Sequence, residues 1–296
     1  MPFFILLLAY VTRRSLDSAD RLNTESIWRQ SFSWGASAPS GREARVWPGI
    51  VIVIIPTLML LALDYILRTL SLVVLASLVD YLLLVLLMGA PGWRLRMEVY
   101  AEAWRRGDMQ AAWHHIKDSL PATERGTASA PEHLHLSVSS RFMVVMFERY
   151  FLIIFWYVVG GIAVAFLVRA VIALRDHWPQ AAARIGFGVA ANLLAWFPVR
   201  VLSFTFGLAG DLTGWLRAGR SSMSNFSATP PLVLMDAANS ALTGYALEPS
   251  RFQKLHPDEW SEYGGRSFSA IRDLLNRSML VWICVLALLV IAGFIA

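Results

Sequence analysis

Five apolar runs of 18 or more residues constrain the fold of this chain most strongly. A helix needs about 20 mainly apolar residues to cross a bilayer core, so each run is long enough to span a membrane. The chain is 56% hydrophobic and only 16% charged, whereas soluble domains carry about 25% charged residues. This composition excludes a soluble globule, a disordered chain and a nucleic-acid-binding arm. The runs cover residues 48–66, 69–88, 150–168, 185–208 and 279–296.

These runs predict an all-α fold, a polytopic membrane helical bundle with about five transmembrane helices, and we expect residues 1–296 to form a single membrane domain. A short link around Arg68 joins the first two runs, which predicts a helical hairpin. Residues 2–12 reach across only about half of a bilayer core, which favours a short N-terminal membrane-associated helix over a span. Residues 232–247 predict a modestly apolar helix, and the sequence leaves open whether it spans the membrane, lies on it or leaves it.

Lysine and arginine counts predict the topology. Six of these residues precede the first span, and the four following connections carry one, seven, three and seven. Because positive residues accumulate on the cytoplasmic side, the segments with six, seven and seven are predicted to be cytoplasmic. The connection near residues 169–184 carries only three, so it is predicted to lie on the opposite side of the membrane. The C-terminus is predicted to be periplasmic. The cytoplasmic segments are residues 13–47, 89–141 and 210–278, and an amphipathic helix is expected over residues 94–120.

Asp80 and Arg200 lie inside predicted spans, at similar depths in helices that run in the same direction. Ionisable residues inside a membrane are costly and indicate a functional site by default. We therefore predict that Asp80 and Arg200 form an ion pair in the bundle interior, with a purely structural pair or a snorkelling arginine as the alternative.

The third span also carries charges close to its ends. Glu148 and Arg169 are separated by 21 residues, about 31 Å of helix, so we predict that they mark the two ends of one span. Asn192 lies in the middle of the fourth span, where it could form a hydrogen bond with a neighbouring helix. The pair Gly160-Gly161 predicts a close approach between the third span and another backbone.

Catalytic motifs are absent from the sequence. There is no Walker A pattern, no GxGxxG, no GxSxG and no HExxH, and no nucleophile is placed beside a base. The single cysteine, Cys284, excludes an intramolecular disulfide and a cysteine-based metal site. His133 and His135 lie in a polar loop without a metal signature. We therefore expect no metal and no cofactor, and leave enzymatic activity undecided, with a non-enzymatic role favoured.

Two segments resemble the AmpE family of multipass inner-membrane proteins. Residues 148–161 read ERYFLIIFWYVVGG and residues 192–201 read NLLAWFPVRV. AmpE proteins are encoded beside the AmpD amidase of β-lactamase induction, and the resemblance covers nearly the whole chain. It implies a bacterial inner-membrane protein with an accessory or signalling role in β-lactamase regulation, cell-wall stress and antibiotic resistance.

The AmpE family resembles, more distantly, the CobD/CbiB membrane synthases of the cobalamin pathway. This chain departs from the synthase pattern at its polar positions. Val144 and Val145 stand where the synthases have Glu and Asn, and only Glu148 keeps an acid. Ile172 and Arg175 replace an Asn and an Asp. The resemblance therefore implies an inherited membrane fold without amide-forming chemistry.

We therefore expect an AmpE-like regulatory protein that acts through ligand or partner binding at its cytoplasmic face. The expected partners are the lipid bilayer and either a cytoplasmic protein or a cell-wall-derived ligand. Nucleic acid is not expected, and a homo-oligomer is compatible with this reading. One alternative is a divergent CobD/CbiB-like enzyme that uses ATP and Mg²⁺, with Glu148, Asp80 and Asp211 as its carboxylates. The other is a protein that handles small molecules or lipids. The candidate binding residues are Asp80, Glu148, Arg149, Asn192 and Arg200.

Overall fold

The computed structural model describes residues 2–18, 24–35, 46–120, 130–242 and 247–293. Over these residues the fold is helical throughout and contains no strand, which confirms the predicted all-α class. The chain divides into two compact units, each taken by itself below, and the prediction of one membrane domain stays a prediction. Unit 1 comprises Met1–Pro91, Glu148–Pro198 and Leu286–Ala296, and unit 2 comprises Gly92–Phe147 and Val199–Val285.

Four helical segments are long and apolar enough to cross a membrane, and α4 (Val73–Leu87) is a shorter apolar helix. These segments confirm the predicted membrane helical bundle. They are α3 (Trp47–Thr69), the stretch Pro131–His177, α9 (Ala181–Ala209) and the stretch Pro257–Ile291, which contains α14 (Tyr263–Ile291).

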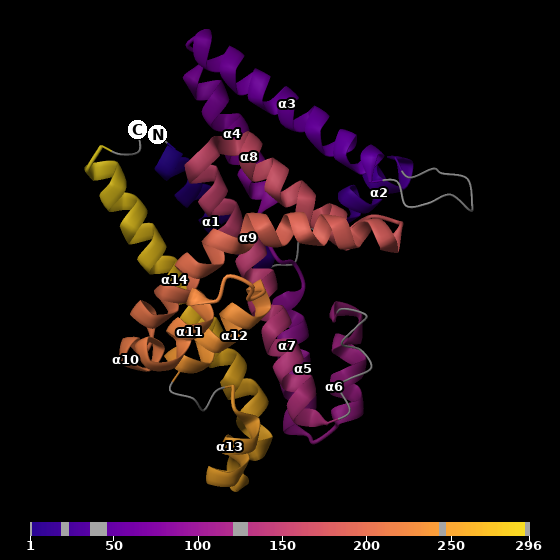
Figure 1. Cartoon of the computed structure of the whole chain (residues 1–296), viewed down its shortest axis with the longest axis vertical. Coiled ribbons are helices and arrows are strands. Elements are labelled where there is room, and N and C mark those ends of the chain that lie inside the picture. The colour runs from indigo at the N-terminus through magenta and orange to yellow at the C-terminus, as the bar shows by residue number, and fades with distance from the viewer. Residues whose placement is uncertain (1, 19–23, 36–45, 121–129, 243–246, 294–296) are drawn as a thin grey trace. The chain divides into compact units, whose positions relative to one another are not determined.

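In unit 1, the N-terminal helix α1 (Pro2–Ser18) packs along α4. Tyr81 donates a hydrogen bond to Thr12 over 3.1 Å, and Arg13 donates one to the Val85 carbonyl over 3.3 Å. These contacts advance in the same direction along both helices, so α1 and α4 run parallel. The helix continues past residue 12, where the sequence predicted its end. Figure 1 shows α3 and α4 as the predicted hairpin.

The third predicted span folds back on itself. The α-helix α7 (Pro131–Met146), a π-helical turn (Phe147–Phe151) and α8 (Leu152–His177) follow one another, but Gly161 interrupts α8 with φ 73° and ψ −171°. In a straight helix, Glu148 and Arg175 would lie about 40 Å apart. Their side chains instead form an ion pair at 2.6 Å, so α8 consists of two antiparallel arms (Figure 1).

This reversal corrects the prediction that Glu148 and Arg169 mark opposite ends of one span. Both residues belong to one charged cluster, because the arms on either side of Gly161 bring their far ends together. The predicted alternation of connections is also wrong. Glu25 of α2 (Glu25–Gly35) accepts a hydrogen bond from Arg169 over 2.8 Å. The N-terminal stretch and the connection near residues 169–184 therefore share one end of unit 1.

Apolar packing reinforces this arrangement. One buried core cluster joins four helices of this unit. It contains Phe32 of α2, Val53 of α3, Leu174 of α8, Trp178 just after α8, and Phe187 of α9. Helix α2 therefore packs against the same end of unit 1 as the start of α9. The link between α3 and α4 lies at the other end of α3, which is 23 residues long.

Cysteine labelling tests this topology. In a cysteine-free background (Cys284→Ser), Ser33→Cys and Ala182→Cys should react with a membrane-impermeant maleimide from the same side of the membrane. Leu70→Cys, in the link between α3 and α4, should react from the opposite side, because α3 is long enough to span. All three positions are exposed. If Ala182→Cys reacted from the same side as Leu70→Cys, the result would instead support the alternating topology predicted from the charge counts.

Unit 2 is organised around buried aromatic residues. Tyr100 and Trp104 of α5 (Trp93–Arg105) surround His135 of α7, and Phe268 of α14 completes the group. His135 is fully buried and bonds Ser267 over 2.9 Å, so it lies in a helix and not in the predicted polar loop. The other helices of this unit are α6 (Met109–Ile116), α10 (Leu212–Gly214), α11 (Arg220–Ser224), α12 (Pro230–Ala241) and α13 (Pro249–Leu255).

Two sequence predictions in unit 2 change. The amphipathic helix expected over residues 94–120 is divided into α5 and α6, because Gly107 adopts φ 74° between them. Helix α12 begins at Pro230 and packs against α7, with Val233, Leu234 and Ala237 fully buried. Most of the helix predicted over residues 232–247 is thus part of the core of unit 2, and residues 243–246 lie outside the described chain.

Candidate functional site

A cluster of charged side chains lies where α2 meets both arms of the α8 reversal. We call it the Glu25 cluster. Glu25 comes from the first turn of α2, Glu148 and Arg149 from the π-helical turn, and the remaining members from the end of α8. Its members are Glu25, Glu148, Arg149, Arg169, Arg175, Asp176 and His177.

Glu25 is the hub of the cluster. Its carboxylate accepts a hydrogen bond from Arg169 over 2.8 Å, forms an ion pair with Arg149 at 2.7 Å, and accepts the Nε2–H of His177. Burial alone would raise the pKa of Glu25, but the His177 hydrogen bond and the charge of Arg149 outweigh it and lower that pKa. The carboxylate is therefore ionised at neutral pH and binds all three donors.

Arg169 is the most deeply buried cation of the cluster, with a fully buried side chain. Its guanidinium lies over the ring of Trp28, 5.4 Å from the centroid, and one nitrogen reaches Glu25. Its Nε and Nη1 atoms have no hydrogen-bond partner among the described residues. Buried donors without partners are costly, so Arg169 depends on Glu25 for compensation.

The second carboxylate of the cluster forms a separate pair. Glu148 accepts two hydrogen bonds from Arg175, at 2.6 and 2.8 Å, in a bidentate arrangement. Arg175 also donates to Asp176 over 2.9 Å, and Asp176 lies 4.0 Å from Arg149. Three carboxylates thus face three guanidinium groups. This arrangement fits recognition and positioning, because each carboxylate is paired with an arginine.

The sequence of α2 explains how Glu25 reaches the cluster. Glu25, Trp28 and Phe32 are spaced i, i+3 and i+7, so they lie on one face of the helix. Trp28 packs on Phe166 and Phe32 on Trp178, with ring centroids 5.8 and 5.9 Å apart. An acidic residue in the first turn also suits the helix dipole. The aromatic residues therefore hold α2 in place and direct Glu25 toward the arginines.

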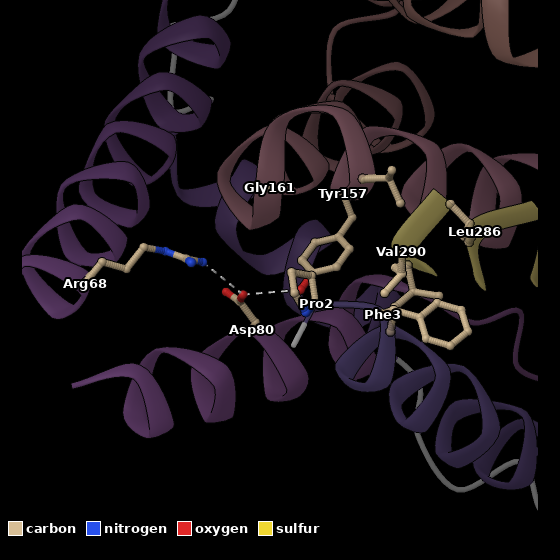
Figure 2. Close-up of a pocket in the computed structure, with 10 residues that line it drawn as sticks. Pro2, Phe3, Arg68, Asp80, Tyr157, Gly161, Leu286 and Val290 are labelled. Carbon is tan, nitrogen blue, oxygen red and sulfur yellow. Dashed lines mark hydrogen bonds and ion pairs between the residues drawn. The ribbon is translucent and has the colours of Figure 1, made fainter. Parts of the chain in front are cut away.

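Asp80 lies in a different part of unit 1. Figure 2 shows Arg68 and Tyr157 directed at its carboxylate. Tyr157 donates to Asp80 Oδ2 over 3.3 Å, and the Arg68 guanidinium lies 3.7 Å from the same atom. These three residues contribute to the lining of a pocket of about 180 Å³.

Arg200 and Asn192 also differ from expectation. Arg200 donates hydrogen bonds to the carbonyls of Met223 and Asn225, over 3.0 and 2.7 Å, and so holds the end of α11 against α9 within unit 2. Asp80 belongs to unit 1 and Arg200 to unit 2, so the predicted Asp80–Arg200 pair stays a prediction. Asn192 is exposed on α9, and its side chain bonds no described residue.

Among the candidate residues of unit 1, Glu148 and Arg149 lie together in the Glu25 cluster, whereas Asp80 and Asn192 lie outside it. Sequence reasoning missed their partners, which are Arg175 for Glu148 and both Glu25 and Asp176 for Arg149. The available signal was Gly160-Gly161, which is compatible with a reversal as well as with a close helix contact.

The enzyme alternative requires converging carboxylates. Glu148 and Asp80 have separate partners, and Asp211 caps the short helix α10. In the part of the chain that the structure describes, no three His, Cys, Asp or Glu side chains form a group that could hold a metal ion.

Together these features define an all-helical membrane protein whose clustered charges pair with one another. A family model described as "Regulatory signalling modulator protein AmpE" matches residues 1–295. The chain therefore belongs to the AmpE family, which confirms the resemblance seen in the sequence. Comparisons with curated proteins and with solved structures gave no match, and the CobD/CbiB resemblance stays a prediction.

Proposed function

We propose that this protein is an accessory factor of β-lactamase regulation in the bacterial inner membrane, and that it signals cell-wall stress by binding an anionic group at the Glu25 cluster. The family supports the regulatory part, because AmpE proteins are regulatory signalling modulators. The anionic group would be a carboxylate or phosphate of a cell-wall-derived ligand or of a cytoplasmic partner protein.

One observation carries the proposal. Glu25 reaches the cluster from α2 and binds three donors from the π-helical turn and α8, namely Arg149, Arg169 and His177. A competing carboxylate or phosphate offers the same acceptor atoms to these donors. Such a ligand would displace Glu25 and weaken the attachment of α2, which gives binding a structural consequence.

Charge also supports a cytoplasmic position for this end of unit 1. The N-terminal stretch carries six Lys and Arg residues and the connection near residues 169–184 carries three, whereas the link between α3 and α4 carries only Arg68. The more positive end of a membrane bundle is generally cytoplasmic. The proposed ligand would then approach from the cytoplasm.

Complementation in the bacterial host tests the proposal. Deleting the gene should change β-lactamase activity after induction with a β-lactam several-fold, and the wild-type chain should restore it. Arg149→Gln should fail to restore it because the cluster loses a donor to the anion. Arg94→Gln, which changes an exposed arginine in α5, should restore it fully. Immunoblots of the membrane fraction compare protein levels.

Two outcomes would overturn the proposal. Unchanged induction after gene deletion would remove the link to β-lactamase, and full restoration by Arg149→Gln would remove the cluster from signalling. His177→Gln is the second variant if Arg149→Gln does not accumulate, because His177 lies at the end of α8 and its loss leaves the arginines in place.

A further inference from the structure

The pocket around Asp80 is separate from the Glu25 cluster and has an unusual combination of walls. On one side lie Asp80, Arg68 and Tyr157. The remaining walls are mostly apolar and come from α1, α8 and the end of α14, including Phe3, Leu6, Val158, Leu286 and Val290. Figure 2 shows the charged groups and several apolar side chains around this space.

The charged side of the pocket has a negative excess. Arg68 donates to both oxygens of Asp64, at 2.8 and 2.9 Å, and lies at the longer distance of 3.7 Å from Asp80. One guanidinium thus faces two carboxylates. Asp80 is 5% exposed, so water compensates its charge poorly.

Asp80 also keeps an unused acceptor. Both of its described contacts, from Tyr157 and Arg68, go to Oδ2. Oδ1 accepts no hydrogen bond from the described residues. A carboxylate oxygen in an apolar environment gains most from a charged donor, because charge-assisted hydrogen bonds are the strong ones.

The pocket size limits what it could hold. An apolar cavity of about 150 Å³ accommodates benzene, which has six heavy atoms. At about 180 Å³ this pocket would take a small polar head and the first few carbons of an apolar chain. The rest of a longer chain would continue outside the pocket.

From these walls, this charge and this size, we infer that the pocket binds a primary ammonium group attached to an apolar chain, with the ammonium on Asp80 and the first carbons among Phe3, Leu286 and Val290. A free amphipathic amine has this chemistry along its whole length. The ethanolamine headgroup of a membrane phospholipid shares the primary ammonium and the first two carbons, and its phosphate would lie outside a pocket of about 180 Å³. The inference is independent of the function proposed for the Glu25 cluster.

Binding of n-octylamine to the purified full-length protein in dodecyl maltoside tests the inference, with the melting temperature as readout. Octylamine should raise the melting temperature in a saturable way, whereas 1-octanol, which has the same chain without the charge, should not. Asp80→Asn should weaken octylamine binding about tenfold or more, because a charge-assisted hydrogen bond is lost. Glu98→Gln, which neutralises an exposed carboxylate in α5, should leave binding unchanged.

Val290→Phe provides a second variant that keeps every charge and fills the apolar part of the pocket. It should also weaken octylamine binding, and it keeps the test decisive if Asp80→Asn does not fold. Equal effects of octylamine and octanol would overturn the inference, unless the lipid experiment below shows an ethanolamine preference that Asp80→Asn removes.

Native mass spectrometry distinguishes the two sources. The protein is taken from bilayers with equal amounts of phosphatidylethanolamine and phosphatidylcholine, whose trimethylated headgroup has no N–H donor. Preferential retention of phosphatidylethanolamine by the wild type, lost in Asp80→Asn, would identify the lipid headgroup. Octylamine binding without such retention would identify a free amine. No octylamine effect and no lipid preference would overturn the inference.

Discussion

Glu25→Gln is expected to lower the free energy of unfolding by about 3–5 kcal/mol, because it removes the counter-charge of a buried arginine. Arg169 has a fully buried side chain and only one of its nitrogens is hydrogen-bonded, to Glu25. The glutamine amide keeps an acceptor but cannot neutralise Arg169 and Arg149. The melting temperature of the purified protein in detergent measures the loss, and new trypsin cleavage at the exposed Arg29 would report that α2 has detached.

Two companion variants separate charge compensation from general damage. Glu98→Gln breaks an exposed i,i+4 pair with Arg94 and should change stability by about 0.5 kcal/mol or less. Glu25→Gln combined with Arg169→Met removes the buried charge along with its partner, so it should be more stable than Glu25→Gln alone. A Glu25→Gln protein that melts like the wild type would show that Glu25 is not the hub of the cluster.

Gly161→Ala is expected to destabilise the protein by about 1–3 kcal/mol through backbone strain alone. The φ of 73° and ψ of −171° fall in a region that is essentially restricted to glycine. An added Cβ would meet no atom within 4 Å, so steric overlap with neighbouring residues makes no contribution. Thermal unfolding in detergent measures the effect.

Gly186→Ala is the matched control. Gly186 lies in α9 of the same unit, has an ordinary helical φ, and also has no atom within 4 Å of an added Cβ. Alanine there should be neutral or stabilise the helix by about 0.5–1 kcal/mol. Equal melting temperatures for Gly161→Ala and Gly186→Ala would contradict the reversal of α8.

The fold class could be predicted because hydropathy acts locally. A run of 18 or more apolar residues has few alternatives to a membrane helix, and the short link around Arg68 leaves the two helices little choice but to form a hairpin. The same local reasoning failed at residues 150–168, since hydropathy is continuous across Gly161. Nothing in the apolar pattern distinguishes one long helix from two antiparallel arms.

The candidate site was predictable only in part. Glu148 and Arg149 attract attention as charges next to an apolar run, and both belong to the Glu25 cluster. Their partners could not be identified, because Glu25 lies more than 100 residues before Arg149 and Arg175 meets Glu148 only after α8 reverses. The contacts of Asp80 with Arg68 and Tyr157 were also missed, because depth in a helix does not determine which helices are neighbours.

Composition and hydropathy were therefore sufficient to predict an all-helical membrane protein, and two short motifs were sufficient to predict its family. The pairing of charges was decided by tertiary structure. A glycine with a positive φ reverses α8, and that reversal turns residues at opposite ends of an apparent span into neighbours around Glu25. The physical reason is that apolar burial depends on each residue's own side chain, whereas an ion pair depends on where two distant residues meet.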